Sequence, residues 1–167
     1  MDRAVLLGIC QGEGGTGGGN SIAPSVTLPE TCVSVDASDV AVGAELAQRA
    51  RDGVWQPVNF FSKTLSPAER KYSAFDKELL AIYTTIKHFR HFLEGRHFTV
   101  YSDHKPLSFA LDSAADRLPR QTRHLSFIAQ FTTDIRHVKG TANVVADALS
   151  CPDLPLISVN DLSLIHI

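Results

Sequence analysis

The stretch HFTVYSDHKPL, residues 97–107, alternates apolar and polar side chains up to Asp103 and then breaks on a histidine, a lysine and a proline. Such alternation is typical of a half-buried strand, and the proline indicates a turn. A hydrophobic core does not need a carboxylate at the end of a strand. In mixed α/β sheets, side chains at such strand ends open into a crevice where ligands bind. The stretch therefore predicts a strand over residues 97–103 that delivers Asp103 to a site.

An apolar stripe precedes this strand and predicts a long helix over residues 67–94. Ser66 can cap its N-terminus, Pro67 suits the first position, and Glu69 completes a capping box. The apolar residues recur at intervals of three and four, as one helical face requires; they are Tyr72, Phe75, Leu79, Ile82, Ile86, Phe89 and Leu93. One face of this helix is therefore expected to pack on a sheet.

The remaining segments complete a mixed pattern of strands and helices. Three strands joined by short turns come first, which favours an antiparallel meander. The further expected elements are strands over 32–38, 43–50 and 55–63, a helix over 118–131, a strand over 132–138 and a helix over 142–150. This order predicts an α/β fold of mixed α+β type, with a five-stranded mixed sheet, its first three strands antiparallel, flanked by helices.

Composition limits the folded part to a single domain. The chain has 167 residues, of which 44% are hydrophobic, enough for one core. The segment 1–28 contains the glycine-rich run QGEGGTGGGNS and is therefore expected to be a disordered leader. A phosphate-binding loop is disfavoured, because no Lys-Ser or Lys-Thr pair follows the glycines. We therefore expect a folded domain at 29–151 and a tail at 152–167.

Charge and hydropathy restrict the partners. The formal net charge of −2 gives no global attraction to nucleic acid, so a nucleic-acid partner requires a local basic patch. No stretch reaches the ~18 consecutive apolar residues of a membrane span, and the first ten residues do not make a signal peptide. We expect no membrane partner and an intracellular location.

Four acids lie where a core does not need them. Asp36 ends the first expected strand as Asp103 ends the fourth, and Glu78 lies beside the apolar stripe of the long helix. Asp147 stands near the apolar face of the last short helix. Asp76 is rotated by about 200° from Glu78 around the helix and is expected to face water. Each acid taken alone is also consistent with a cap, a turn or a solvated side chain.

Together, the four acids indicate a metal site. Carboxylates crowded in a partly buried place repel one another and take up protons, unless a hard divalent cation neutralises them. Two magnesium ions about 4 Å apart can activate a water and stabilise the leaving oxygen of a phosphodiester. The cluster therefore suits phosphodiester hydrolysis without a side-chain nucleophile.

Four blocks of sequence carry a family resemblance: VDASDVAVGAEL, FFSKTLSPAERKYSAFDKELLAI, HFRHFLEGRHFTVYSDHKPL and GTANVVADALS. In order and spacing they resemble the ribonuclease H domain of gypsy-type LTR retrotransposon polyproteins, over residues 31–151. The resemblance implies hydrolysis of the RNA strand of an RNA:DNA hybrid with two Mg²⁺ ions, or Mn²⁺ in their place. It also implies a reverse transcriptase domain of the same polyprotein as partner, in the cytoplasm or in virus-like particles.

The resemblance assigns a role to each acid. Asp36 would bridge both ions, and Glu78 with Asp103 would complete the site of one ion. Asp147 would hold the other ion.

Many ribonucleases H also have a histidine on a loop before the last aspartate, where it relays protons or helps to release product. Here the matching position is ambiguous. His137 lies ten residues before the last aspartate but inside the expected strand 132–138, where a packing role is the alternative. Aligning on VKG instead places Thr141 at the loop position.

Basic residues near the expected site are candidates for nucleic-acid contacts. Arg117, Arg120 and Arg123 are spaced three apart, which gives a basic ridge on a helix. His104 and Lys105 directly follow the strand-ending aspartate. Recognition of a hybrid rests on phosphates, groove shape and the 2′-hydroxyl, which such residues can contact. A solvated helix face explains the ridge equally well, and a surface turn explains His104.

The sequence leaves two classes of function open. The chain is either a hydrolase or an inert nucleic-acid-binding or connection module of the same fold, and the presence of all four acids favours the hydrolase. Both ends fall outside the resemblance. The segment 1–28 does not match the polymerase sequence expected upstream, and the last six residues, LSLIHI, resemble a translated sequencing adaptor.

Overall fold

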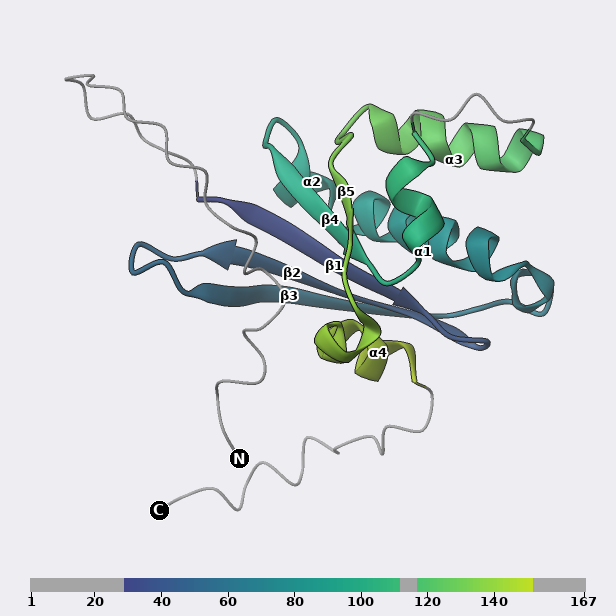
Figure 1. Ribbon diagram of the computed structural model, residues 1–167, viewed down its shortest axis with the longest axis horizontal. Coiled ribbons are helices and arrows are strands. Elements are labelled where there is room, and N and C mark those ends of the chain that lie inside the picture. The colour runs from purple at the N-terminus through teal and green to yellow at the C-terminus, as the bar shows by residue number, and fades with distance from the viewer. Residues whose placement is uncertain (1–28, 112–116, 152–167) are drawn as a thin grey trace, which may run out of the picture.

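A computed structural model describes residues 29–111 and 117–151 (Figure 1). The expected leader at 1–28, with its glycine run, and the expected tail at 152–167 lie outside the described residues. Within the described part of the chain, no helix is both long and apolar enough to cross a bilayer.

A five-stranded mixed sheet forms the centre of the domain, in the order β3-β2-β1-β4-β5. β1, β2 and β3 form an antiparallel meander, whereas β4 pairs parallel with β1 and β5 pairs parallel with β4. The predicted fold class is confirmed. The strands are β1 Thr31–Ala37, β2 Ala41–Arg49, β3 Trp55–Thr64, β4 Phe98–Ser102 and β5 Ile135–His137.

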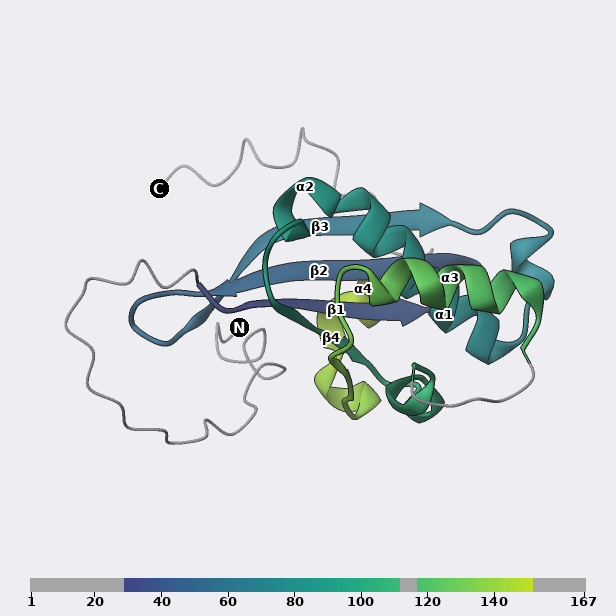
Figure 2. The same ribbon diagram turned by 90° about the horizontal axis from the view of Figure 1, so that it is seen from above.

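Helices cover both faces of this sheet. α1 and α3 lie on one side, and the short α4 lies on the other (Figure 1). Seen from above, α1 and α3 run side by side over the strands (Figure 2). The helices are α1 Ala74–His88, α2 Arg90–Leu93, α3 Pro119–Ala129 and α4 Val144–Ser150, with 3₁₀ turns η2 Glu69–Lys71, η3 Lys105–Phe109 and η4 Gly140–Ala142.

The main core lies between the sheet and α1. Alternate residues of β1, such as Val33 and Val35, point to this side and are fully buried. The apolar stripe of the sequence supplies the other half of the core, with Leu79, Ile82 and Ile86 at 0% exposure. Burial of each such side chain contributes about 1.5–3 kcal/mol. The next residue of β1, Asp36, consequently belongs to the opposite face, where α4 packs.

The prediction of a single continuous helix over 67–94 is wrong, because the structure divides this range into η2, α1 and α2. The Ser66–Glu69 capping box does form, with reciprocal bonds of 2.8 and 3.3 Å, but it holds only the turn η2. α1 starts after Ser73, because the Ser73 hydroxyl accepts a hydrogen bond from the backbone N–H of Asp76 and acts as the actual N-cap. A second break at Phe89 separates α1 from α2.

The expectation that Asp76 faces water is also wrong. The residue is only 8% exposed, because α3 packs beside α1 and supplies partners for its carboxylate. Gln121 donates to Asp76 at 2.8 Å, and Arg120 forms an ion pair with it at 3.2 Å. The Arg120 guanidinium also lies 3.8 Å from the centre of the Tyr72 ring. Asp76 therefore joins α1 to α3.

Candidate metal centre

Three carboxylates meet at the C-terminal ends of the neighbouring parallel strands β1 and β4. Asp36 comes from β1, Asp103 directly follows β4, and Glu78 reaches in from α1. One oxygen of each lies within 4.8 Å of the others, which makes this a group able to hold a metal ion. Oxygen donors so closely spaced suit a hard divalent cation such as Mg²⁺ or Mn²⁺. Asp103 is exposed, so the group opens to solvent on its side.

Glu78 is held at both oxygens. The backbone N–H of Ala37 donates to Oε1 at 3.0 Å, and the Ser102 hydroxyl donates to Oε2 at 3.2 Å. The side chain is 5% exposed. Burial, reinforced by the charges of Asp36 and Asp103, raises the pKa of Glu78 to about 8. Without a cation, Glu78 therefore carries a proton at neutral pH.

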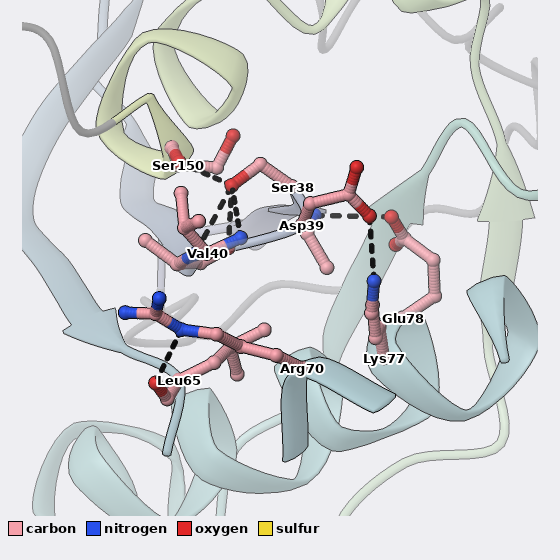
Figure 3. Close-up of polar contacts among 10 residues, drawn as sticks. Ser38, Asp39, Val40, Leu65, Arg70, Lys77, Glu78 and Ser150 are labelled. Atoms are coloured by element: carbon pink, nitrogen blue, oxygen red, sulfur yellow. Dashed lines mark hydrogen bonds and ion pairs between the residues drawn. The ribbon is translucent and has the colours of Figure 1, made fainter. Parts of the chain in front are cut away.

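Asp36 experiences the same crowding. Burial raises its pKa, and the charges of Asp103 and Asp147 act in the same direction, against a hydrogen bond from Ser150 that lowers it. The Ser150 hydroxyl donates to Asp36 Oδ2 at 2.5 Å. The cation next to Glu78 in sequence does not relieve the repulsion, since Lys77 pairs with Asp39 at 2.6 Å. Figure 3 shows this pair beside Glu78, with Ser38 and Ser150 approaching the same corner.

Asp147 lies at the margin of the group. It is exposed on α4 and does not belong to the three carboxylates that meet within 4.8 Å in the described residues. Its charge nevertheless raises the pKa of Asp36, so it is within electrostatic reach. α4 is fixed to β1 by Asn143, whose buried amide donates to the carbonyl of Val35 at 2.8 Å. The structure therefore brings three of the four predicted acids together and places the fourth beside them.

The loop before α4 passes close to the site. A Cβ added at Gly140 would lie 3.2 Å from Asp103 Oδ2, so η4, which contains Thr141, runs against the Asp103 carboxylate. His137 is the exposed last residue of β5, in register with Ser102 on β4. A proton-relay role for His137 stays a prediction.

Comparison with known proteins identifies the family. Residues 29–131 match the family model described as the RNase H-like domain found in reverse transcriptase. The chain belongs to this family. It is 40% identical over 121 residues to the Transposon Tf2-3 polyprotein of Schizosaccharomyces pombe, a match that covers 71% of this chain and 9% of that polyprotein. This RNase H-like domain thus spans about a tenth of the curated relatives it matches.

Solved structures agree on the fold. RNase H1 from Halobacterium salinarum superposes with a TM-score of 0.52 at 16% identity, over 72% of this chain and 92% of that one. LC11-RNase H1 in complex with an RNA/DNA hybrid gives a TM-score of 0.54 at 13% identity, over 72% and 93%. At such identities, the likeness establishes an RNase H-like fold for this domain.

The predicted nucleic-acid contacts of the RNase H-like domain differ in availability. Lys105 opens η3 and is exposed, and half-buried His104 lies with its ring 6.0 Å from that of Phe75. Arg123 is exposed, whereas Arg120 is committed to Asp76. Arg117, partly buried, donates to the carbonyl of Ala110. The three arginines therefore do not form a uniform ridge.

Sequence reasoning missed the hydroxyl groups that hold the carboxylates. Ser102 immediately precedes Asp103, and Ser150 follows Asp147 by three residues. Adjacency to a predicted ligand was the available signal for both. Serine beside a strand or helix end is too common for that signal to be specific.

Metal binding to this domain is expected to release a proton from Glu78. A cation requires the ionised carboxylate, so the apparent affinity should rise about tenfold per pH unit up to about 8, the pKa of Glu78 without metal. Because this pKa is raised by folding, the same group lowers the free energy of unfolding of the metal-free domain as the pH rises from about 5 toward 8. Calorimetric titration with Mn²⁺ at pH 6 and pH 7 measures the change in metal affinity, and equal affinities at the two pH values would contradict the predicted proton release.

Proposed function

We propose that this domain is a metal-dependent endonuclease that hydrolyses the RNA strand of RNA:DNA hybrids. The observation that carries the proposal is the convergence of Asp36, Glu78 and Asp103 within 4.8 Å at the end of two parallel strands. The raised pKa values of Asp36 and Glu78 support it, because burial and the neighbouring carboxylates disfavour their ionised forms, and a bound divalent cation would offset both effects.

In this proposal, some residues of the chain would bind the metal ions and others would orient the metal-binding carboxylates. Asp36, Glu78 and Asp103, with Asp147 for a second ion, would hold two Mg²⁺ or Mn²⁺ ions, which when bound would supply activation of a water and stabilisation of the leaving oxygen. The Ala37 N–H and the Ser102 hydroxyl fix the oxygens of Glu78 before any ligand arrives. Such preorganisation lowers the cost of assembling the site.

The substrate class rests on fold and charge. LC11-RNase H1, which shares the fold, was solved with an RNA/DNA hybrid. Exposed Lys105 and Arg123 can contact the phosphates of such a hybrid, with His104 and Arg117 as further candidates. Arg120 could do so only by leaving Asp76. Since these contacts read backbone and not bases, we expect little sequence preference.

The working context follows from the relatives. The matched family occurs in reverse transcriptases, and the Tf2-3 relative is a polyprotein. We therefore propose that the domain acts beside a reverse transcriptase domain of the same polyprotein, inside the cell. Tethering to the polymerase would raise the local concentration of hybrid at the nuclease site.

The test is cleavage of labelled hybrid by the purified 167-residue chain. With Mg²⁺, we expect cuts in the RNA strand of an RNA:DNA hybrid and none in an all-DNA duplex of the same sequence. A chelator should abolish the cuts, and added Mg²⁺ should restore them. Binding of hybrid without cleavage in Mg²⁺ or Mn²⁺ would contradict the proposal and favour an inert binding or connection module.

A further inference from the structure

The last residue of α4 is tied to the metal centre by its side chain. Ser150 is 1% exposed, and its hydroxyl donates to Asp36 Oδ2 at 2.5 Å. Short bonds from a hydroxyl to a carboxylate are charge-assisted and about twice as strong as neutral ones. The same oxygen lies 2.9 Å from the carbonyl oxygen of Asp147, one turn earlier in α4. Ser150 therefore touches both the buried carboxylate and the helix turn that carries the exposed one.

The position of Ser150 is fixed from several sides. The Ser38 hydroxyl, two residues after Asp36, donates to the Ser150 carbonyl at 2.6 Å (Figure 3). Ser38 in turn accepts from the backbone N–H groups of Val40 and Ala41. On the sheet side, a Cβ at Gly43 would lie 2.5 Å from the Ser150 backbone nitrogen, so α4 rests directly on β2. The backbone of Ser150 is therefore held on both sides, within reach of Asp36.

We propose that Ser150 is a positioning residue of the metal centre, which sets the orientation of the Asp36 carboxylate and its spacing from Asp147. A carboxylate that accepts a bond at Oδ2 cannot rotate freely, so its remaining lone pairs face a fixed direction. This inference rests on the function proposed above. Outer partners of this kind typically change metal affinity by about 10- to 100-fold when they are removed.

The chain offers a matched control for this role. The Ser62 hydroxyl donates to the carbonyl of Leu149 at 2.8 Å and ties α4 to β3, but within the described residues it bonds to no carboxylate. Removal of either hydroxyl therefore deletes one bond between α4 and the sheet. Only removal of the Ser150 hydroxyl also takes a hydrogen bond from the Asp36 carboxylate.

Calorimetric titration of the full chain with Mn²⁺, without nucleic acid, tests the proposal. Ser150→Ala should weaken Mn²⁺ binding at least about tenfold, while Ser62→Ala should bind within about twofold of wild type. Ser150→Cys keeps a weak donor of similar shape, so its Mn²⁺ affinity should lie between those of Ser150→Ala and Ser62→Ala. The half-saturating Mg²⁺ concentration for hybrid cleavage should rise with Ser150→Ala, and excess Mg²⁺ should recover most of the rate.

The outcomes separate this inference from the proposed function. A wild-type chain that binds no Mn²⁺ overturns the proposed function. If the wild-type chain binds Mn²⁺ and Ser150→Ala binds it with the same affinity, the positioning role alone is overturned. Equal weakening in Ser150→Ala and Ser62→Ala also overturns it, because the serine would then only anchor α4. Thermal unfolding in the presence of a chelator confirms that each variant is folded before its affinity is compared.

Discussion

An Asp103→Asn variant is expected to lose hybrid cleavage by about a thousandfold or more while remaining fully folded. The side chain is exposed, and its carboxylate is one of the three that meet within 4.8 Å. Asparagine keeps the shape but loses the charge that attracts a divalent cation. Loss of about 4 kcal/mol of metal-derived stabilisation of the transition state corresponds to a thousandfold in rate.

The same change should not weaken the fold. Besides burial, the charge of Asp103 raises the pKa values of Asp36 and Glu78, so in the metal-free domain ionised Asp103 disfavours the charged form of each neighbour. Removal of one charge relieves that repulsion. With a chelator present, the thermal midpoint of Asp103→Asn should therefore equal or exceed that of wild type. Mn²⁺ should raise the midpoint of wild type but not that of Asp103→Asn.

Asp39→Asn is the matched control for the loss of a carboxylate at this corner. Asp39 lies three residues after Asp36 and is exposed, but it is paired with Lys77 outside the group of three. The variant should cleave hybrid at nearly the wild-type rate. Cleavage by Asp103→Asn at a similar rate would refute the assigned site, and a large loss in both variants would indicate a general effect of charge.

The strands and the buried helix face could be predicted because their signals are local. Alternation over residues 32–38 predicted the first strand, which the structure confirms as β1. The intervals of three and four in the apolar stripe correctly identified Leu79, Ile82 and Ile86 as core residues. Periodicity shows which face of an element is apolar, and in a sheet covered by helices that face packs against the core.

The errors concern contacts between elements distant in sequence. Helical periodicity alone predicted that Asp76 faces water. It could not show that α3 covers that side of α1 and brings Gln121 to the Asp76 carboxylate. The same packing removes Arg120 from the expected basic ridge. The bond from Ser150 to Asp36 joins residues 114 positions apart, and no local pattern in either segment encodes it.

Gly43→Ala is expected to displace α4 and disrupt the metal centre from the face of the sheet on which α4 packs. Gly43 pairs with Asp36 across β1 and β2. A Cβ there would lie 2.5 Å from the nitrogen of Ser150 and 2.6 Å from the carbonyl carbon of Leu149, and it would also collide with the carbonyl oxygen of Ala146. All three atoms belong to the backbone, so no side-chain rotation removes the clash.

The helix must therefore move by roughly 1 Å to reach ordinary contact distances of about 3.5–4.0 Å. Overpacking of this kind costs about 3 kcal/mol of stability. The movement also carries Asp147 outward and strains the bond between Ser150 and Asp36. Since a misplacement of about 1 Å can cost a hundredfold, Mn²⁺ affinity and cleavage should both fall by about that factor.

Gly95→Ala separates the loss of stability from the loss of the site. Gly95 has a φ of +75°, which an alanine adopts at a cost of about 1–2 kcal/mol, but a Cβ there meets no atom within 4 Å. This variant should unfold at a lower denaturant concentration and still bind Mn²⁺ with wild-type affinity. If the Gly43→Ala protein is folded and binds Mn²⁺ with wild-type affinity, the packing of α4 on β2 does not determine the position of Asp147. Weakened affinity in Gly43→Ala alone would locate the effect at that contact, because general destabilisation is present in both variants.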